Sequence, residues 1–222
     1  MKRVIQQVND KYSDLFLKKP RYFILMGGRS AGRSYVASQF AKAKLRAKSY
    51  FRCAIMRLVL GDIRNSIFQD ILDRVEESEL DDEIKVRENP MLSFECGSNV
   101  IKGIGFKKSS GDQKSKLKSL ANYNCIIVEE ADEVSEEDFM QLDDSIRTTK
   151  SDIVIILLLN PPPKNHWIIK RWFNLIPSGI EGYYMPVLKE SCASNTVFIH
   201  STFRDNIKNI NATTLSNLLT LS

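Results

Sequence analysis

The segment 27–34 constrains this chain more than any other. It reads Gly-Gly-Arg-Ser-Ala-Gly-Arg-Ser, and it lies between an apolar run at 22–26 and a segment of helical character at 34–48. Its spacing fits G-x-x-x-x-G-K-[ST], the pattern of a loop that holds phosphate on backbone N–H groups at the start of a helix. The predicted phosphate-binding residues are Gly27, Gly28, Arg29, Ser30, Ala31, Gly32, Arg33 and Ser34. The alternative is a glycine turn that binds no ligand.

Arg33 is the one departure from this pattern, because it stands in the lysine position. A guanidinium keeps the positive charge and can bridge phosphate oxygens, but it is longer and planar, so its reach differs from that of lysine. Ser34 closes the pattern with a hydroxyl that would bind Mg²⁺. The loop by itself therefore predicts nucleotide binding with an altered cation.

The rest of the chain predicts an α/β fold with a mainly parallel central sheet and helices on both faces. Buried strands alternate with helical patterns, as in proteins of this class. The apolar runs lie at 22–26, 51–59, 123–128 and 152–159, and the helical patterns at 34–48, 63–79 and 135–147. We expect an N-terminal helix over 1–18 and a small β-rich insertion over 84–106. The 222 residues are expected to form a single domain.

Composition excludes several other classes. The four cysteines are far apart and form no C-x-x-C pair, so we expect reduced thiols rather than a disulfide framework or a zinc site. No apolar run approaches the length that spans a bilayer, and no signal peptide is expected at the N-terminus. A net charge of +5 is compatible with a polyanionic partner.

Two acids follow the apolar strand at 123–128. Glu129 is placed to act on the metal side together with Ser34, and Glu130 is placed to polarise an attacking water as general base. The alternative is a strand end followed by a solvated acidic helix cap. The loop upstream favours the catalytic interpretation, which corresponds to a P-loop NTPase of the ASCE type.

Asn160 ends the next buried strand and precedes three prolines. A polar amide at this place can sense the γ-phosphate of ATP by hydrogen bonding. A strand followed by a proline-rigid turn is an equally good explanation of this piece alone.

Four motifs in order carry a family resemblance. They are the loop at 27–34, Ile-Val-Glu-Glu-Ala-Asp-Glu at 127–133, Leu-Asn-Pro-Pro at 159–162 and His-Ser-Thr-Phe-Arg-Asp-Asn at 200–206. Together they resemble the large subunit of the terminase of tailed bacteriophages, the motor that packages DNA into the procapsid. The resemblance extends over about 22–206, nearly the whole chain.

The resemblance implies roles for individual residues. Arg29 matches an arginine that acts on the γ-phosphate or senses it, Glu129 the metal-side acid, and Glu130 the catalytic glutamate. Asn160 lies in the coupling motif. Lys116 and Lys118 lie where some relatives carry a finger that reaches the nucleotide of a neighbouring subunit; a solvated basic loop is the alternative.

The resemblance also implies ATP and Mg²⁺ as cofactors. It implies double-stranded DNA, the portal protein and the terminase small subunit as partners, and a homo-oligomeric ring during packaging with a monomer in isolation. The expected location is the cytoplasm of the infected host, without a membrane. No acidic constellation for a C-terminal nuclease domain is present in the sequence, so nuclease activity is not expected.

Two other functions compete with the packaging ATPase. One is a nucleotide-binding assembly or docking module with little catalysis, in which Arg33 marks a degraded loop. The other is a different DNA-translocating ATPase, such as a helicase. The segments 160–162 and 202–206 argue against this second alternative.

Overall fold

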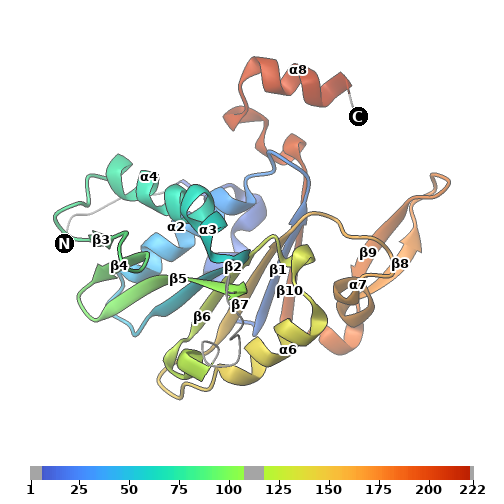
Figure 1. The fold of residues 1–222 in the computed structure, drawn as a ribbon. Helices are drawn as coiled ribbons and strands as arrows, with labels where there is room; N and C mark the ends of the chain where they lie inside the picture. Colours follow the sequence, from blue (N-terminus) through green and yellow to red (C-terminus); the bar gives the residue numbers. More distant parts are fainter. Residues whose placement is uncertain (1–6, 108–117, 221–222) are drawn as a thin grey trace.

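The computed structural model describes residues 7–107 and 118–220, and its centre is one large sheet (Figure 1). The strands of this sheet are β1 (Tyr22–Gly27), β2 (Arg52–Val59), β3 (Lys85–Arg87), β4 (Ser93–Cys96), β5 (Asn99–Lys107), β6 (Cys125–Glu129), β7 (Val154–Leu159) and β10 (Thr196–Ser201). Their spatial order is β10-β1-β7-β6-β2-β5-β4-β3. A separate hairpin joins β8 (Phe173–Pro177) to β9 (Tyr184–Leu188) and projects from the body.

The helices and helical turns connect these strands. They are η1 (Asp10–Tyr12), α1 (Asp14–Leu17), α2 (Arg33–Leu45), α3 (Leu60–Ile63), η2 (Arg64–Phe68), α4 (Gln69–Glu77), η3 (Lys118–Asn122), η4 (Ala131–Glu133), α6 (Glu136–Ser145), α7 (Trp167–Trp172), η5 (Glu190–Cys192), η6 (Phe203–Asn209) and α8 (Ala212–Thr220). No helix among the described residues is long and apolar enough to cross a bilayer.

The strand order decides where the site lies. β10, β1, β7, β6, β2 and β5 all pair in parallel, and β7 lies between the loop strand β1 and the acid strand β6. The carboxyl ends of parallel strands meet at one edge of the sheet, which is where open α/β sheets bind ligands. The ends of the three strands that carry the sequence motifs are therefore neighbours.

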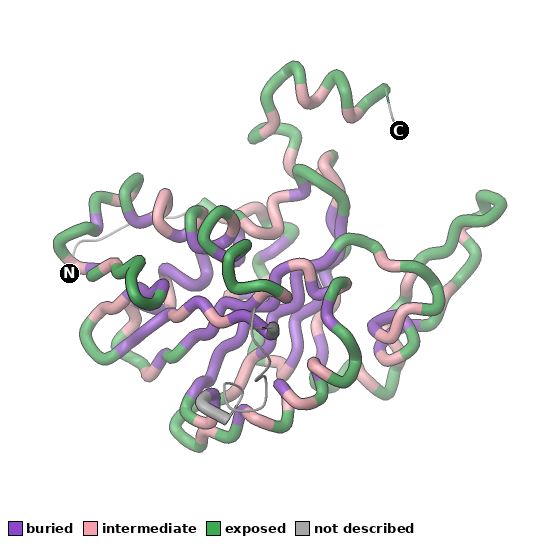
Figure 2. Tube along the Cα trace, in the orientation of Figure 1, coloured by how far each residue is buried: buried purple, intermediate pink, exposed green. Residues whose placement is uncertain are grey.

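Two apolar layers hold the helices against the sheet, and the strands are its most buried part (Figure 2). Alternate residues of each strand point to opposite faces. One layer includes Leu25, Ile127 and Phe68 and lies under α2 and α4. The other includes Ile24 and Trp172 and lies under α6 and α7. The predicted sheet with helices on both faces is confirmed.

The N-terminal expectation is wrong over the part of 1–18 that the structure describes. Residues 7–18 form two short turns, η1 and α1, instead of one helix. The Asn9 side chain accepts from the backbone N–H of Lys11 at 2.9 Å and starts η1. Tyr12 is thereby buried against the main body, with 2% of its surface exposed.

The segment 84–106 is rich in strands, as expected, and these strands continue the central sheet. β5 pairs in parallel with β2, and β4 and β3 add antiparallel strands beyond it. No sequence pattern indicated β8, because Phe173 follows directly on the helical pattern of α7. All four cysteines are free, as predicted, and Cys53 and Cys125 are buried.

Lys42 is a buried cation between α2 and α4, with 2% of its surface exposed. Its Nζ donates to the carbonyl oxygen of Arg74 at 3.1 Å and to Ser78 Oγ at 2.7 Å. Burial, with a smaller contribution from the Arg74 charge, lowers the pKa of Lys42 from 10.5 to about 8. Between these values the unfolded chain binds a proton that the folded chain has released, so stability rises with pH.

We therefore expect the urea midpoint of the wild type to rise between pH 8 and pH 10 relative to that of Lys42→Met. Comparison with the variant cancels the other titrating groups, which both proteins share. Parallel midpoint curves for the two proteins would contradict the assignment.

Candidate functional site

The loop between β1 and α2 turns through two left-handed residues. Ser30 has φ 61° and Gly32 has φ 86°, and α2 begins at Arg33. The free N–H groups and positive end of α2 therefore face this loop. Gly27 is required for another reason, since a Cβ there would lie 2.1 Å from the carbonyl oxygen of Ser201 in β10.

The structure separates the two loop arginines. Arg33 turns back under the loop, where its guanidinium donates to the carbonyl oxygen of Leu159, to that of Gly28 at 3.3 Å and to Asn160 Oδ1 at 2.9 Å. Burial lowers the pKa of Arg33 from its usual value. Arg29 is exposed, and no described residue forms a hydrogen bond or ion pair with it.

Ser34 and Glu129 lie together at the start of α2 and the end of β6. Ser34 Oγ donates to Glu129 Oε1 at 3.4 Å. Glu129 is 8% exposed, and its second oxygen, Oε2, is buried without a hydrogen-bond partner among the described residues. A buried carboxylate oxygen that accepts no hydrogen bond is costly unless a ligand occupies it. One hydroxyl and one carboxylate fit Mg²⁺, which keeps most of its ligands as water and phosphate oxygens.

Glu130 follows in a left-handed conformation, with φ and ψ of 50°. Its carboxylate forms an ion pair with Arg57 of β2, whose Nε also lies 3.8 Å from Glu129 Oε2. Arg57 was not among the predicted site residues. The signal was an arginine near the carboxyl end of a mainly apolar strand whose other charged residue, Arg52, lies at its start.

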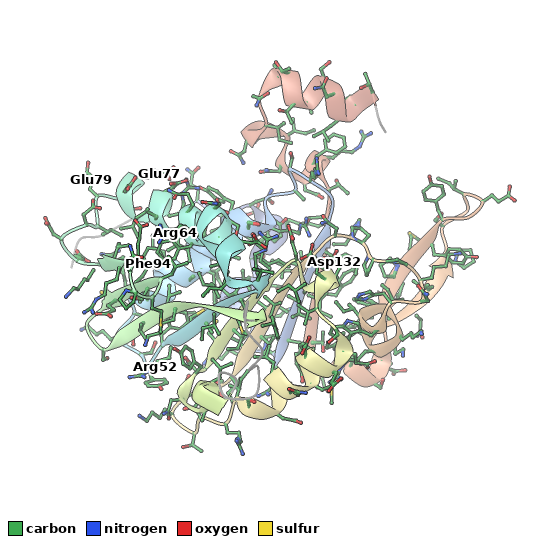
Figure 3. All side chains as sticks on the ribbon, in the orientation of Figure 1. Arg52, Arg64, Glu77, Glu79, Phe94 and Asp132 are labelled. Atoms are coloured by element: carbon green, nitrogen blue, oxygen red, sulfur yellow. The ribbon has the colours of Figure 1, made fainter. Side chains whose placement is uncertain are left out.

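Asn160 and Asp132 connect the second and third motifs. The backbone N–H of Asn160 donates to Asp132 Oδ1 at 3.3 Å. A ring nitrogen of His166 lies 3.0 Å from the carbonyl oxygen of Asp132. Figure 3 labels Asp132 at the edge where the carboxyl ends of the strands meet, and Arg52 at the opposite edge. Together with Arg33, these contacts join the loop, the acid strand and the Asn160 strand.

Two further acids interact electrostatically with Glu129 and Glu130. The pKa of Asp70, in α4, is raised by burial and by the nearby Glu129 charge. The pKa of Glu133 is raised by burial and by Glu130. Lys116 lies outside the described residues, and Lys118 begins η3 at a place where side chains are not described. Their predicted role in a neighbouring subunit stays a prediction.

Most of the chain, including the residues of this site, matches one protein family. Residues 19–217 match the family described as phage terminase large subunit. The chain belongs to this family. It is 26% identical over 213 residues to the PBSX phage terminase large subunit of Bacillus subtilis (strain 168), covering 92% of this chain and 47% of that protein. The chain thus spans about half the length of its curated relative.

Two solved structures of another terminase share the fold. The large terminase of a thermophilic bacteriophage matches with a TM-score of 0.71 at 13% identity, over 96% of this chain and 50% of that one. The same protein in complex with ATP-gamma-S matches with a TM-score of 0.64 at 12% identity, over 95% and 48% of the two chains. At this identity the likeness establishes the α/β fold.

This terminase chain has an open cavity of about 750 Å³ beside the loop. Gly32 is shared between the loop and the cavity wall, which also contains Tyr12, Tyr35 and Asn206. The guanidinium of Arg74 lies over the Tyr35 ring, 4.8 Å from its centroid. The sequence patterns did not identify this cavity, because its walls come from both ends of the described chain.

Proposed function

We propose that this chain is the Mg²⁺-dependent ATPase part of a motor that moves double-stranded viral DNA into a procapsid. The observation that carries the proposal is the pairing of Ser34 with Glu129, whose second oxygen is buried beside the loop and accepts no hydrogen bond from the described residues, with the Arg57 guanidinium at ion-pair distance. A glycine turn without a ligand has no need for this arrangement. Membership of the terminase large subunit family and the ATP-gamma-S complex of the thermophilic phage relative support it.

Each motif residue then has a task. The N–H groups of the loop and the start of α2 hold the phosphates, and Ser34 and Glu129 would hold Mg²⁺. When bound, the ion neutralises charge that develops on the phosphate oxygens. Glu130 leaves Arg57, orients a water against the γ-phosphorus and takes its proton. Asn160, held by Arg33 at the end of β7, reports the presence of the γ-phosphate.

The cavity beside Gly32 is large enough for the nucleoside part of the nucleotide. A phosphate chain on the loop would direct the nucleoside past Gly32 toward the exposed Tyr35 ring, and an aromatic ring can stack on a base. Tyr35 is 46% exposed and is backed by Arg74, which orients its ring. We infer that the adenine base stacks on the Tyr35 ring.

The partners follow from the same proposal: double-stranded DNA, the portal protein, the small subunit and neighbouring copies in a ring, in the host cytoplasm. Lys164 and Lys170 are exposed cations near the β8–β9 hairpin, and Lys164 Nζ lies 3.7 Å from the centroid of the Tyr184 ring. Cations of this kind can track DNA phosphates without reading sequence.

The two loop arginines should respond differently to substitution. We expect Arg29→Ala to lower turnover at least tenfold with an unchanged melting temperature, because its guanidinium has no contact to lose within the described structure. Arg33→Ala should lower both the melting temperature and the ATP affinity, because three acceptors lose their donor. Calorimetry and titration with a fluorescent ATP analogue measure both effects. Equal behaviour of the two variants would contradict this division.

A second candidate function is a nucleotide-binding module with little turnover. The ion pair of Glu130 with Arg57 favours it, because a carboxylate held by a guanidinium does not activate water. Steady-state phosphate release with Mg²⁺, with and without DNA, decides between the two. Tight ATP binding without turnover, at high protein concentration and with DNA, would favour the module.

A further inference from the structure

Two side chains from outside the phosphate loop hold two carbonyl groups of the loop. Asn206 Nδ2 donates to the carbonyl oxygen of Ser30 at 2.9 Å. The Tyr12 hydroxyl donates to the carbonyl oxygen of Ala31 at 2.6 Å. Tyr12 comes from η1, before the loop in sequence, and Asn206 from η6, long after it. Consecutive peptide groups of the loop are thus held from two separate elements.

These contacts fix the direction of the loop N–H groups. A trans peptide group is planar, and its C=O and N–H bonds point in opposite directions. The carbonyls of Ser30 and Ala31 share their peptide groups with the N–H groups of Ala31 and Gly32. Because Asn206 and Tyr12 hold the carbonyls, these two N–H groups point away from those side chains.

The loop conformation needs such external contacts. Ser30 has a Cβ and a φ of 61°, a left-handed conformation that costs about 1–2 kcal/mol for an L-residue. Strained residues of this kind persist only where the surroundings determine them. The Asn206 side chain also packs on the other left-handed residue, since a Cβ at Gly32 would lie 3.4 Å from Asn206 Cγ.

Both holding side chains are themselves oriented. Asn209 Nδ2 donates to Asn206 Oδ1 at 2.8 Å, which fixes which end of the Asn206 amide faces the loop. The fully buried Ser201 hydroxyl shares a hydrogen bond with Tyr12 at 2.8 Å. Their rotamers are therefore set before any ligand binds.

We propose that Asn206 and Tyr12 are positioning residues that aim the N–H groups of Ala31 and Gly32 at the phosphates of the nucleotide. This inference rests on the proposed function in one respect, because it takes the bound ligand to be a nucleotide. It gives the Thr-Phe-Arg-Asp-Asn segment at 202–206 a physical task, which the family resemblance alone left open. The two residues act on the phosphate part of the ligand and leave the nucleoside part alone.

Competition titrations with ATP, ADP and adenosine test the proposal in Asn206→Ala and Tyr12→Phe. Loss of one oriented hydrogen bond is expected to weaken ATP and ADP binding up to roughly tenfold. Adenosine binding should stay within about twofold of the wild type. Asn211→Ala is the matched control: Asn211 Oδ1 accepts from the Thr214 N–H at 2.8 Å in α8, and no contact within the described structure joins it to the loop. It should bind all three ligands as the wild type does.

Equal weakening of adenosine and ATP in Asn206→Ala, or behaviour like that of Asn211→Ala, overturns the proposal. A second readout does not need nucleotide. The amide ¹H–¹⁵N resonances of Ala31 and Gly32 should shift in both positioning variants and not in the control. Unshifted resonances overturn the positioning role even if ATP binds. If the resonances shift but the wild-type chain binds no ATP, the positioning role stands and the proposed function is refuted.

Discussion

Glu130→Gln is expected to lower ATP turnover by roughly 10²–10⁴-fold while leaving ATP binding intact. Glutamine keeps the shape of the side chain but cannot take a proton from water. The geometry supports this expectation, because Glu130 directly follows Glu129, and Glu129 accepts a hydrogen bond from Ser34 of the phosphate loop. Phosphate release with Mg²⁺ and DNA measures turnover, and a fluorescent ATP analogue measures binding.

Glu136→Gln is the matched control for this experiment. Glu136 is an exposed acid at the start of α6, and no contact in the described part of the chain joins it to Glu130 or to the loop. We expect its turnover to stay within about threefold of the wild type. If Glu130→Gln retains more than a tenth of wild-type turnover, Glu130 is not the general base.

Gly27→Ala should destabilise the chain by about 3 kcal/mol, at the upper end of ordinary overpacking, and lower the melting temperature by roughly 6–12 °C. The added methyl group would lie 2.1 Å from the Ser201 carbonyl oxygen, which belongs to the backbone of the neighbouring strand β10. Although β10 is the edge strand, its backbone is paired with β1 and cannot rotate away as the end of a side chain can. Thermal unfolding without nucleotide measures the effect.

Gly28→Ala provides the comparison at the next residue. A Cβ at Gly28 would meet nothing within 4 Å, and Gly28 does not have a positive φ. We expect its melting temperature to match the wild type. If the two variants melt alike, the close approach of β1 to β10 is not the reason for the first glycine of the motif.

The membership of the chain in the terminase family was recognisable from four short motifs, and the structure explains why each motif is local. A strand, a glycine turn and a helix start are consecutive in sequence, so their chemistry is visible in 27–34. Glu129 and Glu130 follow a run of apolar residues, and Asn160 follows another. Apolar strand runs and helical patterns can each be recognised within a short segment. Their alternation along the chain was therefore enough to predict a sheet with helices on both faces.

The N-terminal turns show that helical spacing of apolar residues does not by itself establish a helix. Apolar residues recur near helical spacing in 1–18, yet residues 7–18 form η1 and α1. Asn9 caps a short turn, and Tyr12 turns inward to hydrogen bond with the loop and with Ser201. A contact with a residue 189 positions away cannot be deduced from local spacing.

Local sequence was enough to predict the class of fold and to place the loop at 27–34, the two acids and Asn160 at the ends of strands, because these depend on neighbouring residues; their chemical roles stay predictions. Which of the two loop arginines lacks a hydrogen-bond partner in the described structure depends instead on tertiary packing. Arg33 is engaged at the end of β7, and Arg29 is exposed. Arg57 reaches the acids because Met56 pairs with Val128, which puts the next residue of β2 beside Glu129. Such contacts depend on strand order and register, which bring together residues far apart in the chain.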